Sequence, residues 1–234
     1  PGIASGETIA ALAFTEDNGR WDADGITLEA KGGKLTGTKM FVLDGHIATS
    51  IIVVARDPGT KGADGIGFYL VDGMADGLTR TPLSTMDMTR KQAKLEFANT
   101  PATKIGPGGW DAMSKTLDQA AVALCAEMVG GAQHCMDMAV QYAKDRIQFG
   151  RPIGSFQAIK HKCADMLLEV ESAKSASYYA AWAAAEDNDE LPVVAALAKA
   201  YCSEAYFHTA AENIQIHGGI GFTWEHDAHL YFKR

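Results

Sequence analysis

The chain has 234 residues, enough to bury one or two hydrophobic cores, and 47% of them are hydrophobic. Its formal net charge of -8 argues against nucleic acid as a partner. It contains neither an apolar run of transmembrane length nor a signal-peptide pattern, so we expect a cytoplasmic protein without a membrane span.

The first half of the chain shows short hydrophobic alternations separated by glycine-rich turns. Such short runs without intervening helices are typical of strands. They predict strands at residues 9–15, 26–30, 34–43, 50–55, 67–71, 78–82 and 94–97. We therefore expect an antiparallel β-sandwich or barrel domain over residues 1–105.

Gly106-Pro-Gly-Gly109 interrupts this pattern, and helical periodicity follows it. The periodicity predicts long helices at residues 110–146, 155–186 and 192–216, and a last helical piece from Trp224. Three long helices and a fragment predict an up-down helical bundle over residues 106–234. The whole chain is thus expected to be α+β, with a β domain first and a helical bundle second.

The four cysteines all fall in the predicted helices. None forms a C-x-x-C pair, so we expect free, mostly buried thiols in a reducing cytosol. The spacings of histidine, cysteine and acidic residues match no metal site, and no bound metal is expected. The cysteines are Cys125, Cys135, Cys163 and Cys202.

Two motifs in the helical half carry the functional signal. Residues 145–166 read D-R-x-Q-F-G-x-P-I-x-x-F-Q-x-x-K-H-x-x-A-D-M, where one helical pattern closes and the next opens. An arginine at a helix end, followed by an amide at Gln157, offers donors to a phosphate-bearing ligand. The second motif, Q-I-H-G-G-I-G-F at residues 215–222, follows a helix, unlike a Rossmann loop, which follows a strand. We expect a glycine helix cap at Gly218 or Gly219 and close approach of a ligand to that backbone.

Both motifs closely resemble signatures of the acyl-CoA dehydrogenase family of flavoproteins. The resemblance implies that residues 1–105 are the middle β domain on the flavin side. It implies that residues 106–234 are the C-terminal helical domain, which holds the ADP half of a neighbouring subunit's FAD and forms the oligomer interface. Pro1 falls after the family's N-terminal helical domain and Arg234 falls inside its final helices, so we expect a fragment of a longer protein.

The resemblance places several residues on the neighbour's cofactor. Arg146 matches the arginine that contacts the cofactor phosphates, with a surface ion pair to Asp145 or a nearby acid as the alternative role. Phe149 matches a residue on the adenine side, with core packing as the alternative, and Gln215 could also be an ordinary exposed glutamine. The other implied contacts are Gln148, Gln157, Gly218 and Gly219.

The flavin side departs more from the family pattern. Phe14-Thr15-Glu16 resembles the strand end whose threonine hydroxyl bonds the flavin edge. Trp21 stands in the place of the usual serine, which approaches flavin and substrate. Phe41 replaces the usual stacking tryptophan and Leu43 the usual threonine, so ordinary sheet packing is the alternative for both.

The reaction implied by the resemblance is α,β-dehydrogenation of an acyl-CoA thioester. A carboxylate removes the α-proton while a hydride leaves the β-carbon for the flavin. One family position for that base is Ala120, which cannot serve, and the other lies beyond Arg234. Asp118 lies where some members contact CoA, although an exposed helix aspartate is the alternative. Glu127 is expected to pack or form a salt bridge.

The sequence is compatible with three functions. One is an ordinary homotetrameric acyl-CoA dehydrogenase, with electron-transfer flavoprotein as its acceptor. Another is a non-catalytic subunit of a heteromeric tetramer, which would complete a partner's FAD site. The third is a flavin-dependent monooxygenase on the same fold. The acyl group, whether a fatty chain or a sterol side chain, is not fixed by the sequence.

Overall fold

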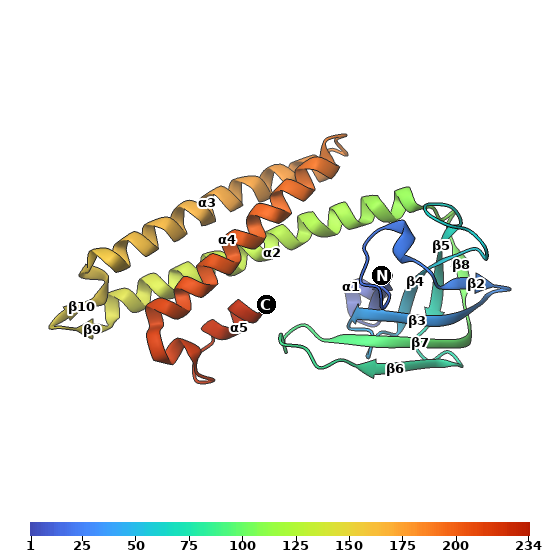
Figure 1. The fold of residues 1–234 in the computed structure, drawn as a ribbon, viewed down its shortest axis with the longest axis horizontal. Helices are drawn as coiled ribbons and strands as arrows, with labels where there is room; N and C mark the ends of the chain where they lie inside the picture. The colour runs from blue at the N-terminus through green and yellow to red at the C-terminus, as the bar shows by residue number, and fades with distance from the viewer. The chain divides into compact units, whose positions relative to one another are not determined.

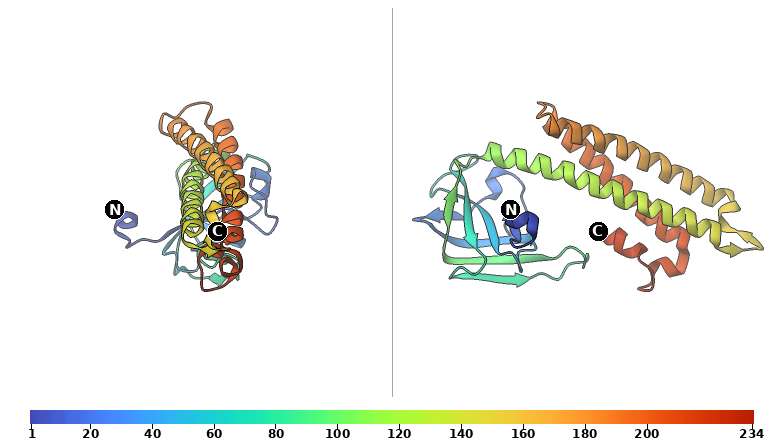
Figure 2. Two further views of the ribbon diagram at one scale, coloured as in Figure 1. Left: turned by 90° about the vertical axis from the view of Figure 1, so that its left-hand side faces the viewer. Right: turned by 180° about the vertical axis from the view of Figure 1, so that it is seen from behind.

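The computed structural model describes all residues, 1–234, as two compact units, Pro1–Met113 and Ser114–Arg234 (Figure 1). No helix in it combines the length and the apolar character that crossing a membrane requires. The first unit, the β unit, is built around a β-sheet. The second, the helical unit, consists mainly of long helices (Figure 2).

The first unit holds eight strands, a short helix and one 3₁₀ turn. Strand β3 (Lys34–Leu43) and strand β6 (Leu78–Pro82) have the predicted bounds, and the other predicted strands shift by a few residues. A further strand was not predicted, because three residues are too few to show alternation. The remaining elements are α1 (Gly2–Ser5), β1 (Ala10–Ala13), η1 (Ala23–Gly25), β2 (Glu29–Lys31), β4 (Ser50–Arg56), β5 (Ile66–Asp72), β7 (Gln92–Pro101) and the unpredicted β8 (Thr103–Ile105).

The sheet is mixed, with strand order β6-β7-β3-β2-β4-β5-β8 and β1 paired to β4. The α+β class is confirmed, but the expectation of a wholly antiparallel sheet is wrong. Strands β1 and β2 both run parallel to β4, while the other pairings are antiparallel. Parallel neighbours need a long crossover, and residues 32–49, with the β3 hairpin arm, supply it between β2 and β4. The end strands β6 and β8 do not pair, so the sheet is not a closed barrel.

Alternate residues of the strands point into one core, as strand geometry requires. On β4, for example, Ile51, Val53 and Ala55 are fully buried and pack with Val71 of β5 and Leu95 of β7. Removing such side chains from water supplies most of the free energy that stabilises this unit.

A buried ion pair joins strand β3 to the loop that follows β1. The Lys39 ammonium is wholly buried and donates to Glu16 Oε1 at 2.7 Å and to the Phe14 carbonyl at 3.0 Å. Burial lowers the pKa of Lys39 to about 8, against the opposing pull of Glu16. Burial alone would raise the pKa of Glu16, but the Lys39 charge and hydrogen bonds from Thr27 and Leu28 lower it overall. The carboxylate therefore holds together the β1 end, β3 and the segment before β2.

The second unit contains α2 (Trp110–Asp145), which begins in the first unit, α3 (Gln157–Ala185), α4 (Leu191–His217) and α5 (Ala228–Lys233). The long helices match the predicted ranges within two residues at each end. They run up, down and up, as the views from the front and from behind show (Figure 1 and the right panel of Figure 2). Short elements join them: β9 (Ile147–Gln148), β10 (Arg151–Pro152), η2 (Ile153–Ser155) and η3 (Gly218–Phe222).

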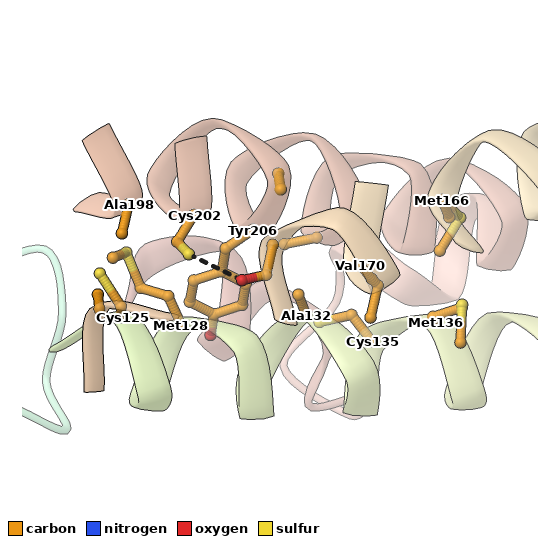
Figure 3. Packing of buried hydrophobic residues seen from close by; sticks show 14 of the residues in the cluster. Cys125, Met128, Ala132, Cys135, Met136, Met166, Val170, Ala198, Cys202 and Tyr206 are labelled. Carbon is orange, nitrogen blue, oxygen red and sulfur yellow. Dashed lines mark hydrogen bonds between the residues drawn. The ribbon is translucent and has the colours of Figure 1, made fainter. Parts of the chain in front are cut away.

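Helices α3 and α4 approach each other closely, and small side chains make room for larger ones in the core of the helical unit. Figure 3 shows Tyr206 of α4 among alanine, cysteine and methionine side chains of the helices. A Cβ added at Gly131 of α2 would lie 2.6 Å from the Tyr206 ring, so only glycine fits there. The expected free thiols are confirmed, and the Cys202 thiol donates to the Ala173 carbonyl at 3.4 Å. Three of the four are buried and Cys163 is partly exposed.

We predict that Glu16→Ala destabilises the β unit by about 3–5 kcal/mol, because it leaves the Lys39 charge buried without its partner. Urea unfolding of the full chain, followed by tryptophan fluorescence, measures the loss. The exposed Glu7→Ala is the matched control and should change stability by less than about 0.5 kcal/mol. Equal stability of the two variants would contradict the role of the pair.

Candidate functional site

The chain reverses direction after α2 in a tight hairpin. The two-residue turn between β9 and β10 is Phe149-Gly150, with φ angles of 55° and 76°. Left-handed conformation at both positions suits a two-residue hairpin, although it strains a residue with a Cβ. The Phe149 ring is 92% exposed and meets the Phe156 ring edge-on at 6.0 Å. The core-packing alternative for Phe149 is therefore wrong.

Arg146 precedes this hairpin with a fixed backbone and a free side chain. Its amide donates to the Tyr142 carbonyl and its carbonyl accepts from the Ile153 amide, each at 2.8 Å. The guanidinium is exposed and makes no hydrogen bond or ion pair within the chain. Asp145 accepts from Gln141 instead, so the ion-pair alternative is wrong. A permanently charged group is thus held at a defined place and left available to a ligand.

The end of α4 presents an open stretch of backbone. Gly218 caps the helix with φ 64°, as expected, and its amide donates to the Ile214 and Gln215 carbonyls. No atom lies within 4 Å of a Cβ added at Gly218 or Gly219. At Gly221, by contrast, a Cβ would lie 2.9 Å from the His217 side chain. The first two glycines thus face open space, while the third packs against the helix.

An aromatic stack joins the two helix ends. The Tyr142 ring of α2 stacks on the His217 ring of α4 at 4.3 Å, and His217 in turn meets His226 at 4.3 Å. Tyr142 lies one helical turn before Arg146, and His217 directly precedes Gly218. The structure therefore brings the two sequence motifs to the same end of the helical unit, as the ribbon shows (Figure 1).

Sequence reasoning did not single out His217 as the contact that joins the motifs. Its ring is 6% exposed, and Nδ1 lies 2.8 Å from the Asn213 carbonyl oxygen. Burial lowers the pKa of His217, and the nearby His226 lowers it further, against the hydrogen bond to Asn213. The neutral ring therefore donates from Nδ1 to that carbonyl. Its place inside the glycine motif was the available signal, but stacking partners are invisible in a sequence.

The three glutamines of this end differ in their contacts. Gln148 donates to the carbonyl of its neighbour Ile147 at 2.8 Å. Gln157, the first residue of α3, and Gln215, on the last turn of α4, are exposed and have no side-chain partner in the chain. Two exposed amides and one free guanidinium thus lie on the elements that meet at this end of the helical unit.

The β unit holds the residues assigned to the flavin ring. Thr15 is 7% exposed, and the Phe14 ring meets the Trp21 ring at 5.0 Å and 89°. Phe41 and Leu43 are 49% and 44% exposed, so the alternative that they pack inside the sheet is wrong. A β-bulge between Lys39 and Val42 interrupts the alternation of buried and exposed residues along β3, so Phe41 is exposed.

Backbone strain marks the same strand end. Phe41 has φ 57° and Asp44 has φ 51°, conformations that cost non-glycine residues about 1–3 kcal/mol each. Such strain persists where surrounding structure fixes it and is concentrated at functional sites. The exposed apolar pair Phe41 and Leu43 thus stands on a strained strand end.

The helix positions that the family resemblance assigns to the catalytic base and to CoA carry few groups that could serve those roles. Ala120 is exposed on α2 and has no ionisable group. Asp118 is half-buried and has no hydrogen bond or ion pair within the chain. Glu127 forms an ion pair with Arg234 at 2.8 Å, which confirms its expected structural role.

One hollow of about 460 Å³ opens elsewhere in the β unit. It shares no residue with the candidate site, and its deepest acid, Glu16, is already engaged by Lys39. We assign it no role. Its lining is Glu16, Asp17, Asn18, Thr27, Leu28, Thr36, Gly37 and Thr38.

Comparison with known proteins identifies the class. The family described as "Acyl-CoA dehydrogenase, C-terminal domain" matches residues 107–234, and the chain belongs to the acyl-CoA dehydrogenase family. Members of this family are flavoproteins.

Named relatives agree with this family. The chain is 37% identical to acyl-CoA dehydrogenase IpdE2 of Mycobacterium tuberculosis, over 100% of this chain and 66% of that protein. It is 30% identical to the caffeyl-CoA reductase-Etf complex subunit CarC of Acetobacterium woodii, over 99% of this chain and 64% of that protein. The solved Tcur3481-Tcur3483 steroid ACAD (G363A variant) superposes with a TM-score of 0.86 at 33% identity, over 99% of this chain and 62% of that one. The chain thus spans about two thirds of the length of these relatives.

We predict that acidification weakens the helical unit through His217. Its folded-state pKa lies below the ordinary value of 6.5, so the unfolded chain binds the proton more readily. The stability contributed by the neutral ring is present above that value and is lost as the pH falls below it. Urea midpoints measured from about pH 7.5 to about pH 5.5 should fall less in His217→Gln than in the parent chain. The exposed His161→Gln is the control, and a matching reduction in that variant would refute the assignment to His217.

Proposed function

We propose that this chain is part of an FAD-dependent acyl-CoA dehydrogenase, an oxidoreductase that acts on the CH–CH bond of an acyl-CoA thioester. The observation that carries the proposal is the end of the helical unit, where the Tyr142-His217 stack joins the helix ends that bear the free Arg146 guanidinium and the open Gly218-Gly219 backbone. The family membership supports the same activity. The relatives compared above give no support to a monooxygenase.

The residues present fit a dinucleotide cofactor. Arg146 would bind the pyrophosphate of an FAD held mainly by a neighbouring subunit, because a guanidinium offers planar, charge-assisted donors. The glycine pair lets that ligand approach the backbone, since no side chain fills the space. Phe149 would pack on the adenine side, and the amides of Gln148, Gln157 and Gln215 complete this half-site.

We assign the other half of a cofactor site to the β domain expected over residues 1–105, which lies within the first unit. Bound FAD would supply the hydride acceptor for the reaction. Thr15 would donate its hydroxyl to the flavin edge, and Phe41 would pack on the ring. Leu43 would act through its backbone, because its side chain has no polar atom. Trp21 and Asp118 would lie on the substrate side.

The proton of the substrate needs a different residue. The α-carbon proton must pass to a carboxylate while the β-hydride leaves, and Ala120 cannot accept it. We infer that this chain donates its Arg146 half-site to a partner subunit that supplies the base. Loss of polar groups at Phe41 and Leu43, beside retention of the Arg146 half-site, supports this division. The paired name of the Tcur3481-Tcur3483 steroid ACAD is consistent with a two-protein enzyme.

Further partners follow from the surface of the helices. On α3, Tyr178 is 72% exposed, and Tyr179 and Trp182 are each 48% exposed. Three large rings on one stretch of helix favour burial in an oligomer, and we propose a tetramer. Electron-transfer flavoprotein is the proposed electron acceptor, since the relative CarC is named as a subunit of an Etf complex. The free thiols suit a cytoplasmic setting.

We predict that Arg146→Ala lowers the flavin content of the assembled full-length enzyme. The lost contact is worth about 1.5–3 kcal/mol, or roughly a ten- to hundred-fold weaker FAD affinity. Flavin absorbance after dialysis measures it, and Arg146→Lys should lie between the two. Arg151→Ala is the control, because that guanidinium already lies over the Phe156 ring at 4.1 Å. Full flavin retention in Arg146→Ala would exclude the phosphate contact.

We also predict that the full-length subunit alone does not oxidise acyl-CoA. Turnover should appear when the partner encoded with it is added, with about one FAD per two chains. Steady-state assays with an artificial electron acceptor and sedimentation of both samples test this. Full turnover by the lone chain with one FAD in each subunit would rule out the division of labour.

A further inference from the structure

The loop after β1 presents an aromatic corner that family membership does not explain. Trp21 is 65% exposed, and its ring stands at 89° to the Phe14 ring, with centroids 5.0 Å apart. Isolated exposed apolar residues are common on proteins and need no function. Two perpendicular rings are different, because together they form an apolar angle, and here the Trp21 side of it stays largely exposed.

Hydrogen bonds fix the loop that carries this aromatic corner. The Asn18 side chain bridges the loop, accepting from the Arg20 amide at 2.8 Å and donating to the Gly25 carbonyl at 2.9 Å. From β4, the buried Arg56 donates to the Ala23 carbonyl at 2.7 Å and to the Ile26 carbonyl. Trp21 is therefore carried on a loop whose two ends are fixed, so little conformational entropy is lost when a ligand binds.

The residues on either side of Trp21 cannot bury it. Arg20 and Asp22 form an ion pair with each other at 2.9 Å, and Asp24 lies 3.4 Å from the same guanidinium nitrogen. These three side chains pair with one another on the surface of the loop, and the indole next to them stays largely exposed. The exposed indole is thus a built feature of the loop.

The corner adjoins the proposed flavin side. Phe14 directly precedes Thr15, and the Phe14 carbonyl accepts from the Lys39 ammonium, two residues before the strained Phe41. Whatever fills the corner therefore lies next to the strand end assigned to the reacting centre. An indole offers roughly 200 Å² of flat apolar surface, far more than a thin alkyl chain can cover.

We infer that Trp21 and Phe14 form a specificity-determining wall that favours acyl-CoA thioesters with a bulky alicyclic ring near the reacting carbons. A rigid ring covers both faces of the corner at once, whereas a linear chain contacts one face and loses chain entropy. This assignment rests on the proposed acyl-CoA dehydrogenase function. It goes beyond that function by naming the class of acyl group.

The test compares cyclohexylpropanoyl-CoA with nonanoyl-CoA, which has the same carbon count. The full-length enzyme, with FAD and any required partner, should lose roughly ten-fold or more of its kcat/KM preference for the cyclic thioester in Trp21→Ala. Trp21→Phe keeps a flat ring and should retain most of the preference. Ile3→Ala, which removes a 69% exposed side chain of the same unit, should leave the preference unchanged. Thermal unfolding confirms that each variant is folded.

Two results would overturn the inference. One is an unchanged preference in Trp21→Ala, and the other is an equal loss for both thioesters, which would place the indole on the CoA portion or in loop support alone. Calorimetric binding of the same two thioesters separates this from failure of the proposed function. If the cyclic thioester binds selectively and this depends on Trp21, but no turnover is seen, the specificity role of Trp21 is supported and the proposed dehydrogenase activity is rejected. Binding of neither thioester would reject both.

Discussion

Burial of the Lys39 charge is the constraint on which the β unit depends. An ammonium inside a sheet needs a paired carboxylate and further acceptors, because the interior solvates charge poorly. Glu16, which follows β1, meets this need. Its carboxylate also accepts hydrogen bonds from Thr27 and Leu28, just before β2, so these segments are brought together at Lys39. The same convergence fixes Phe14 beneath Trp21 and sets the strand from which Phe41 emerges. The chain segments that carry Phe14, Thr15 and Phe41 are thus linked by one electrostatic requirement.

The helical unit solves a different problem with neutral groups. Its core is filled because small residues such as Gly131 on α2 make room for the Tyr206 ring of α4. At one end, the uncharged His217 stacks on Tyr142 and aligns two segments that are distant in sequence. The Arg146 backbone groups and the His217 ring are paired within the chain, while the Arg146 guanidinium is not. A charge left free beside satisfied neighbours is most simply explained by a ligand that the chain itself does not contain.

The two units differ in what they offer a cofactor. The helical end offers charge and open backbone, which suit phosphates. The β end offers the exposed apolar groups Phe41, Leu43 and Trp21 and a single hydroxyl at Thr15, which suit a flat ring and an acyl group. Apolar contacts are less selective for orientation than hydrogen bonds, because dispersion and hydrophobic burial are non-directional. Under the proposed function, backbone groups at the strained end of β3 would orient the flavin.

The sequence alone determined every long helix, most strands, and the two motifs that meet at the α2 and α4 ends. These features depend on local periodicity and on residue types with specific chemistry, both of which are written along the chain. Only the tertiary structure decided that β1 and β2 run parallel to β4, because strand direction depends on how connections cross the sheet. It also decided that Phe41 and Leu43 face outward, since a single bulge reverses the alternation from which burial is predicted. The stack of Tyr142 on His217 and the corner of Trp21 with Phe14 likewise required coordinates. Contacts between residues far apart in sequence arise from packing of the whole unit, and no local pattern encodes them.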